Sequence, residues 1–109
     1  MAFDEGVAER IREELGDLPD IVEKKMFGGI AFMHSGHMCC GVVADVLMAR
    51  VGPDAYADAL SRPHAREMDF TGRAMKGFVY VDPPGFDEDG QLHEWIDICL
   101  SFTGSLPAK

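Results

Sequence analysis

The chain has 109 residues, and its 47% hydrophobic and 27% charged content is that of a globular protein rather than a disordered tail. This length suits one core, so residues 1–109 are predicted to form a single domain. No apolar run approaches the roughly 20 residues needed to cross a bilayer, and the acidic, amphipathic N-terminus matches neither a signal peptide nor a transit peptide. We therefore expect a soluble cytoplasmic protein without membrane contact.

The net charge of −9 is concentrated toward the two ends of the chain. Residues 1–23 hold eight acidic residues against two arginines, and residues 82–99 hold six acidic residues without any Lys or Arg. Residues 24–81 are slightly basic, with seven basic residues against five acidic ones. Because a polyanion repels nucleic acid, direct nucleic acid binding is not expected, although the middle of the chain can present a local basic patch.

A first helix is predicted after Asp4, which is a good N-cap, and before Gly16, which suits the left-handed residue that ends a helix. Its apolar residues recur at spacings of three and four, as expected for a helix that packs on one side. They are Val7, Ala8, Ile11 and Leu15.

The middle of the chain is predicted to be a β-meander. Its glycines recur too often for a helix interior, and the short apolar runs between them have the length of strands. Strands are expected at residues 21–27, before and after a two-residue turn at Ser35-Gly36, and at residues 46–51 after a second turn at Ala44-Asp45. Gly28-Gly29 would turn the chain after the first strand.

The Ser35-Gly36 turn also predicts a register. His34 would then oppose His37 and Phe32 would oppose Cys39. Because side chains alternate between the two faces of a strand, one face would carry Ile30, Phe32, His34, His37 and Cys39, and the other Ala31, Met33, Met38, Cys40 and Val42.

The second half is predicted to hold a short helix opened by Pro53, a late strand over residues 78–81 with residues 68–70 as a hairpin partner, and a last helix capped by Asp87 or Asp89. Residues 64–76 show no consistent period. The inner stripe of the last helix comprises Leu92, Trp95, Ile96, Cys99 and Leu100. The fold class is therefore α+β, with three helices packed on a mainly antiparallel sheet.

Two groups of residues are candidate sites. Three ligands of a zinc site would share one face of the hairpin, namely His34, His37 and Cys39, and the same Cys39 beside His37 could act as a nucleophile. The favoured alternatives are exposed turn histidines and buried, packed thiols at Cys39, Cys40 and Cys99, because no C-x-x-C pair is present. We expect no metal and no cofactor.

The second group is basic. Lys25, Arg50, Arg73 and Lys76, with Lys24, are expected to converge around one sheet edge as a patch for an anion or for the acidic surface of a partner. Two alternatives are that these are separate solvated charges, or that Arg50 is held in a structural pair by Glu23 or Asp69. Several Met residues of the meander would either fill the core or line an adaptable partner surface.

The order of the elements and the short motifs between them resemble the N-terminal domain of the TfoX/Sxy family of bacterial proteins. The resemblance rests on Lys25-Met26-Phe27-Gly28-Gly29 entering the meander and Arg50-Val51-Gly52 leaving it, with Met75-Lys76-Gly77 before the late strand and Trp95 in the last helix. It covers roughly residues 8 to 103.

The resemblance implies an α+β fold like that of the secretion chaperones. Competence regulators of this family carry a second, helical domain, and this chain stops about where that domain would begin. The family is also linked to transcriptional activation with a cyclic-AMP receptor protein. We expect a stand-alone, non-enzymatic regulatory module that binds a protein partner or forms a homodimer; the alternative is a thiol- or metal-dependent enzyme centred on His34, His37 and Cys39.

Overall fold

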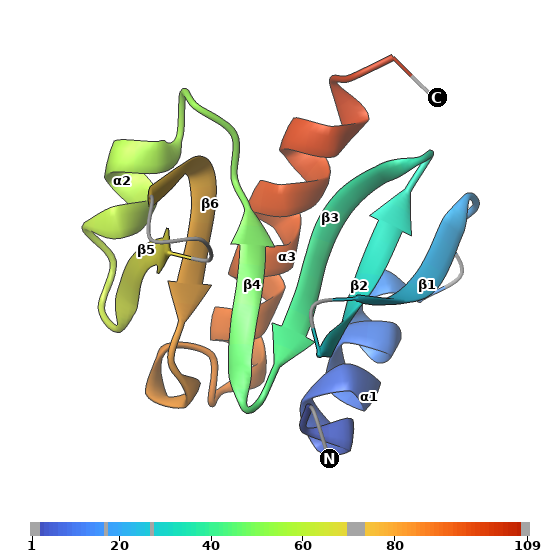
Figure 1. Ribbon diagram of the computed structural model, residues 1–109, viewed down its shortest axis with the longest axis horizontal. Coiled ribbons are helices and arrows are strands. Elements are labelled where there is room, and N and C mark those ends of the chain that lie inside the picture. Colours follow the sequence, from blue (N-terminus) through green and yellow to red (C-terminus); the bar gives the residue numbers. More distant parts are fainter. Residues whose placement is uncertain (1–2, 17, 27, 70–73, 108–109) are drawn as a thin grey trace.

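The protein forms an open six-stranded antiparallel sheet with three α-helices on one face (Figure 1). The computed structural model describes residues 3–16, 18–26, 28–69 and 74–107. The elements in chain order are α1 (Glu5–Leu15), β1 (Ile21–Met26), β2 (Gly29–His34), β3 (His37–Val43), β4 (Val46–Arg50), α2 (Tyr56–Leu60), β5 (Ala65–Asp69), β6 (Ala74–Val81), a 3-10 turn (Pro83–Gly85) and α3 (Asp89–Gly104). The predicted α+β class is confirmed.

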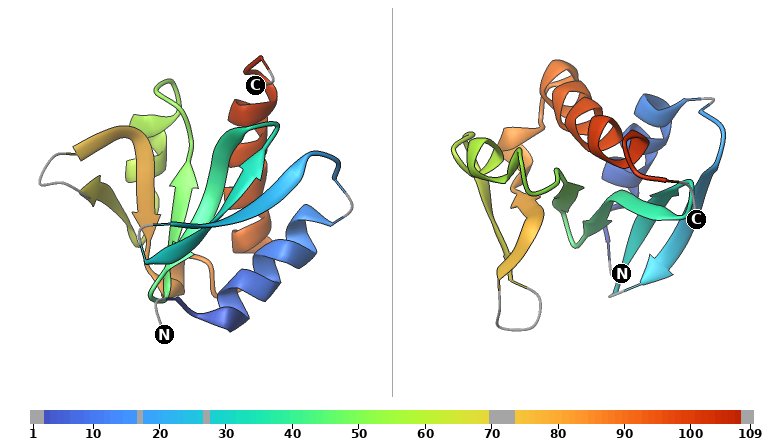
Figure 2. Two further views of the ribbon diagram at one scale, coloured as in Figure 1. Left: turned by 45° about the vertical axis from the view of Figure 1, so that its right-hand side comes forward. Right: turned by 90° about the horizontal axis from the view of Figure 1, so that it is seen from above.

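The strands are ordered β1-β2-β3-β4-β6-β5, so β1 and β5 are the edges. Figure 2 shows the helices gathered on one side of this sheet and leaving the other side without a helix. The main core lies between the two layers. It includes Ile11 of α1, Phe32 of β2, Leu47 of β4 and Trp95 of α3, each at most 2% exposed.

Side-chain hydrogen bonds cap the N-terminal ends of α1 and α3. The Asp4 side chain accepts hydrogen bonds from the backbone N–H groups of Gly6 and Val7, which confirms the predicted cap of α1. In α3 the predicted caps were wrong by one position: Glu88 caps the helix in a reciprocal box with Gln91. No helix in the described ranges is long and apolar enough to cross a membrane.

The two predicted meander turns are confirmed, because His34 pairs with His37 and Val43 pairs with Val46. The predicted register of the first hairpin is wrong beyond Met33–Met38. Phe32 pairs with Cys40, so Cys39 is an extra residue that forms a β-bulge. A bulge turns two successive side chains toward the same side, and Cys39 and Cys40 both lie in the core beneath the helices.

Three predictions for the second half need correction. The second helix begins at Tyr56, because residues 53–55 form a turn before it. The partner of the late strand is Ala65–Asp69, one strand of a longer hairpin than predicted, whereas predicted partner residue Phe70 lies outside the described residues. The late strand itself begins at Ala74, which pairs with Asp69 of β5, whereas its pairing with β4 is confined to residues 78–81.

Candidate functional site

The sheet face that the helices leave uncovered is called the open face here. The strand pairing identifies the residues whose side chains project from this face, because paired residues project from the same face of a sheet. One row crosses all six strands through Lys24, Ala31, Gly41, Met48, Tyr80 and Arg66, each paired with the next. Met48 lies directly over Gly41, where an added Cβ would come within 2.7 Å of the Met48 methyl carbon.

A second row of the open face is apolar and partly exposed. Val22 pairs with Met33, and Met33 pairs with Met38. Val22 is 60% exposed, and both methionines are half-buried. Phe78 lies farther along the same face, paired with Arg50. The open face therefore presents flexible thioether side chains and, farther along, an aromatic ring, a combination suited to an adaptable contact.

The two layers of the protein differ in charge. The three helices carry eight acidic residues and two arginines. On the open face, the Arg66 guanidinium is neutralised by Asp82 at 3.2 Å and stacks on Tyr80. Among the described side chains, neither Lys24 nor Arg50 has a carboxylate within 4.0 Å. The acidic surface thus belongs to the helix layer, and Lys24 and Arg50 remain as cations of the open face among the side chains that the structure describes.

Arg50 lies where β3 and β4 diverge. The pairing of these strands ends at Cys40–Ala49, one residue before Arg50. The half-buried guanidinium fills the opening, with its carbon 5.4 Å from the Phe78 ring centroid and 5.2 Å from that of Phe102. Phe102 belongs to α3, so this one side chain joins the sheet to the last helix. The alternative of a pair with Glu23 does not hold, since Glu23 bonds Arg12 at 2.7 Å.

The two residues that follow Arg50 connect the end of β4 to its neighbours. Gly52 has φ of +85°, and a Cβ there would lie 2.3 Å from the Phe102 ring. The backbone N–H groups of Val51 and Gly52 both donate to the carbonyl of Gly77, at 2.8 and 3.1 Å. The Arg-Val-Gly segment and the glycine of Met75-Lys76-Gly77 therefore build one junction between β4, β6 and α3.

The structure does not bring the predicted basic patch together at one sheet edge. Lys25 lies on edge strand β1 and pairs with Ile30, a core residue, so it projects toward the helix side, opposite to Arg50. Lys76 lies in β6, next to the other edge. Arg73 lies outside the described residues. Adjacent Lys24, rather than Lys25, shares the open face with Arg50 because strand side chains alternate.

The three cysteines are free and meet in the core between β3 and α3. Each has no exposed surface, which agrees with the prediction of packed thiols. Hydrogen bonds from the thiols of Cys40 and Cys99 to the Cys39 sulfur lower the pKa of Cys39. The same hydrogen bonds to Cys39, followed by burial, raise the pKa values of Cys40 and Cys99. Cys39 is therefore the most acidic thiol of the cluster.

The histidines of the hairpin contact the end of α3 rather than a common centre. The Thr103 hydroxyl donates to the Cys99 carbonyl at 3.1 Å, so it accepts from Nδ1–H of His34 at 2.8 Å. His37 instead donates from Nε2 to the Pro107 carbonyl. The two histidines thus bond to different residues near the C-terminus, and within the described residues no group of three or more His, Cys, Asp or Glu side chains is arranged to hold a metal ion.

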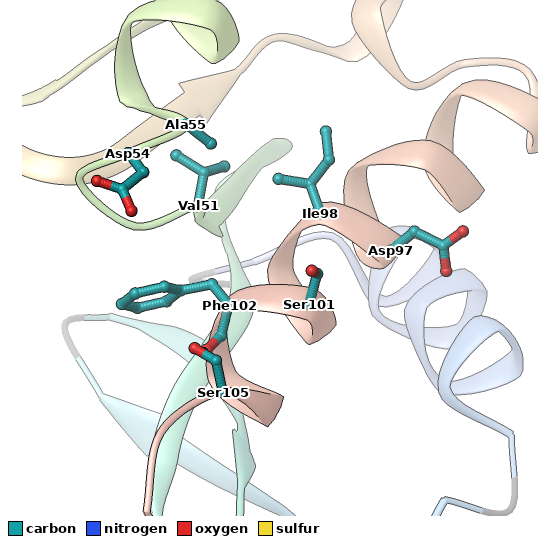
Figure 3. Close-up of a pocket in the computed structure, with 8 residues that line it drawn as sticks. All are labelled: Val51, Asp54, Ala55, Asp97, Ile98, Ser101, Phe102 and Ser105. Carbon is teal, nitrogen blue, oxygen red and sulfur yellow. The ribbon is translucent and has the colours of Figure 1, made fainter.

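A groove lies between the start of α2 and the second half of α3 (Figure 3). Its volume is about 560 Å³, and Val51, Ile98 and Phe102 form its apolar wall. Asp54 and Asp97 lie at opposite ends, and the Asp97 carboxylate points away from the wall toward His93, with which it pairs at 3.2 Å. The groove thus has an apolar interior without a converging set of catalytic groups among its lining residues.

Sequence reasoning missed Phe102 and Thr103 as partners of the predicted site residues. Both lie on the last helix at positions that its apolar stripe did not include. The available signal was the glycine of the Arg-Val-Gly motif. A glycine in such a motif indicates that another part of the chain lies close to the backbone, but it does not identify Phe102 as that neighbour.

A family model described as the TfoX N-terminal domain matches residues 13–103. The match includes β1 to β6 and nearly all of α3, with the motifs that build the Arg50 junction. No curated protein and no solved structure matches the chain. The chain therefore belongs to the TfoX N-terminal domain family.

Proposed function

We propose that this chain is a cytoplasmic, non-enzymatic regulatory module that binds an acidic protein partner through the open face of its sheet. The observation that carries the proposal is the separation of the two layers: the acidic residues of the helices lie on one side, and the open face presents apolar side chains together with Lys24 and Arg50, which have no carboxylate within 4.0 Å among the described side chains. As the resemblance to competence regulators implies, such a module would act in gene regulation through its partner.

The apolar part of the open face supplies the contact area. Met33 and Met38 are paired across β2 and β3, and Val22 extends the same row at the edge. Exposed apolar side chains that form a contiguous row are typical of interaction surfaces, and methionine adapts to differently shaped partners. Phe78 adds an aromatic group of the kind that is enriched at the centres of interfaces.

The charges define the chemistry of the partner. Lys24 and Arg50 favour carboxylates, whereas the helix layer repels them, so an acidic protein is oriented with its charges toward the open face. Within the described part of the open face, Lys24 and Arg50 alone are few for nucleic acid, whose binding depends on neutralising many phosphates. An acidic protein surface that also carries apolar side chains is the better match.

A second copy of this chain fits the surface less well than a different protein. If the acidic helices of one copy covered the open face of another, the contact would be head-to-tail and would continue from copy to copy. Pairing through edge strand β1 is disfavoured by its charged residues Glu23, Lys24 and Lys25, since charges on an edge oppose strand addition. We therefore favour a heterologous complex over the homodimer, and light scattering of the free protein would show a monomer.

The alternative of a thiol enzyme has little support in the geometry. The Cys39 sulfur has no exposed surface for a substrate, and the nearby His37 is bonded to the Pro107 carbonyl. A nucleophilic cysteine needs both access and a base in contact. These contacts favour a structural role for the hairpin histidines, which fasten the end of α3 to the sheet.

Two adjacent lysines provide a matched test of the proposed surface. Lys24 and Lys25 are both exposed on β1, but they project to opposite faces. The partner retained by the immobilised protein from an extract of its native cell should be lost with Lys24→Glu and kept with Lys25→Glu. Equal retention by the two variants, or loss only with Lys25→Glu, would overturn the proposal.

A further inference from the structure

The last helix carries apolar side chains beyond the stripe that packs on the sheet. Trp95, Ile96 and Cys99 are buried in the core. Ile98 and Phe102 are four residues apart, so they lie on the same side of the helix, and both are only half-buried. Apolar side chains of a helix are normally covered by a neighbouring element. Ile98 and Phe102 therefore form a second apolar stripe whose cover has to be identified.

The neighbouring helix α2 leaves this second stripe partly uncovered. It has only five residues, Tyr56–Leu60, and it packs mainly on β5 and β6. The groove of about 560 Å³ remains between α2 and α3, with Val51, Ile98 and Phe102 as its apolar wall (Figure 3). This volume lies within the roughly 300–1,000 Å³ that is typical of binding pockets.

The polar part of the groove carries negative charge. None of the lining residues that the structure describes is basic, and two of them are aspartates. Asp54 is exposed and has no basic group within 4.0 Å among the described side chains. The Asp97 carboxylate is turned toward His93, so it contributes to the field at the groove without facing the apolar wall.

The end of α3 adds to this negative field. The helix ends at Gly104, and the carbonyl end of a helix carries a partial negative charge that favours nearby cations. The last turn of α3 holds no basic residue that would neutralise this charge. Phe102 and Ser105, which both line the groove, lie at this end. The groove thus places an apolar wall next to a site that favours a cation.

We propose that this groove binds a basic segment of another protein, in which apolar side chains lie next to lysine or arginine. The apolar side chains pack against Val51, Ile98 and Phe102, and the neighbouring cation reaches Asp54. A segment with the same apolar side chains and acidic neighbours would be repelled by the aspartates and by the end of α3. Charge complementarity therefore defines the chemistry of the occupant.

This inference does not depend on the proposed function of the open face. The groove lies in the helix layer, on the other side of the sheet, and it favours the opposite charge. Methyl groups report on the two surfaces separately: Ile98 lies in the groove, whereas Met33 and Met38 lie on the open face. Failure of one proposal would leave the other in place.

The test uses three acetylated and amidated heptapeptides as probes, with binding followed by methyl NMR of the protein labelled at its Met and Ile methyl groups. The first probe is Lys-Leu-Leu-Lys-Leu-Leu-Lys, the second has Glu in place of every Lys, and the third has Ser in place of every Leu. We expect the first probe to shift the Ile98 resonance and to leave Met33 and Met38 in place. The other two probes should leave Ile98 unchanged at the same concentration.

Variants separate binding in the groove from general attraction to an acidic protein. Asp54→Asn should weaken binding of the first probe about two- to fivefold, as for loss of an exposed ion pair. Glu13→Gln is the matched control, because it removes one exposed carboxylate from α1 without changing the groove, and it should bind as the wild type does. Ile98→Ala should weaken binding about tenfold, because it removes part of the apolar wall.

Four results would overturn the proposal. One is an Ile98 resonance that does not respond to the first probe. Another is an equal response to the probe that carries Glu. A third is an equal loss of affinity in Asp54→Asn and Glu13→Gln. The fourth is an Ile98 shift that depends on protein concentration without peptide, which would assign the groove to a second copy of this chain. The wild-type protein with the first two probes decides the question even if a variant fails to fold.

Discussion

The Arg50 guanidinium lies 5.2 Å from the centroid of the Phe102 ring and joins the end of β4 to α3. The Phe78 ring flanks it at 5.4 Å on the sheet side. A half-buried cation between two rings is worth more than an exposed one, because less water competes for it. Arg50 is therefore first a structural connection in this protein.

Replacing this cation should lower stability. We expect Arg50→Ala to reduce the free energy of unfolding by about 1–3 kcal/mol, given roughly 0.5–2 kcal/mol for each cation–π contact. Arg50→Lys should retain part of that energy, because the charge remains while the planar stacking is lost. Urea denaturation measures both, and an Arg50→Ala protein as stable as the wild type would show that the stack contributes nothing.

Gly52 should be the glycine least tolerant of a side chain in this region. Gly52→Ala would strain a φ of +85° and place a methyl group 2.3 Å from the Phe102 ring, so we expect a loss of about 2 kcal/mol or more. Gly104→Ala is the matched control: a Cβ there meets nothing within 4 Å, and alanine favours the helix. Thermal unfolding compares the two. Equal effects at both positions would contradict the close contact between Gly52 and Phe102.

The contact between α1 and α3 should depend on pH through His93. The hydrogen bond to Glu14 at 2.8 Å, with the charges of Asp97, Glu14 and Glu94, raises the pKa of His93 above its ordinary value of 6.5. A raised pKa stabilises the folded state below the ordinary value, and this contribution is lost as the pH rises through the raised value. His93→Gln should therefore be less stable than the wild type near pH 6 and equal to it near pH 9.

An NMR titration of the His93 ring provides the direct check of this pKa. A midpoint at or below the ordinary value would remove the basis for the expected pH dependence. Glu14→Gln is a useful companion variant, because it removes the carboxylate that makes the largest contribution and should bring the midpoint down.

Trp95 should be a core residue whose loss is costly. It is 2% exposed within the main core, and the Arg62 guanidinium covers its ring at 5.5 Å. Trp95→Ala should lower the free energy of unfolding by about 3–5 kcal/mol, as for other large-to-small core changes. Trp95→Phe should cost less because it leaves a smaller cavity. Unchanged urea denaturation of Trp95→Ala would place the residue outside the stabilising core.

Elements defined by local chemistry could be predicted from the sequence. The inner stripe of α3 follows from helical periodicity, and the Ser35-Gly36 turn follows from residues that tolerate positive φ, here +52° and +87°. Only the end of β5 was predicted, and residues 65–67 and the first half of β6 were missed, because residues 64–76 have no period of their own and their pairing depends on neighbouring strands.

The candidate site could be predicted only in part, because it depends on long-range geometry. The bulge at Cys39 is visible only in the pairing of β3 with β2, and no local residue pattern indicates it. Without the bulge, the two cysteines were assigned to opposite faces. The prediction of one basic patch was wrong for a related reason. Lys25 and Arg50 both belong to the motifs that flank the meander, but strand order and the alternation of side chains place them on opposite faces of the sheet.

The most direct test of the central claim is methyl NMR of the protein labelled at its Met and Ile methyl groups, with and without the captured partner. Met33 and Met38 report on the open face, and Ile98 reports on the groove between α2 and α3. If the partner binds the open face, the Met33 and Met38 resonances will shift and broaden while that of Ile98 stays in place. A shift of Ile98 with unchanged Met33 and Met38 would contradict the account and assign the partner to the helix side.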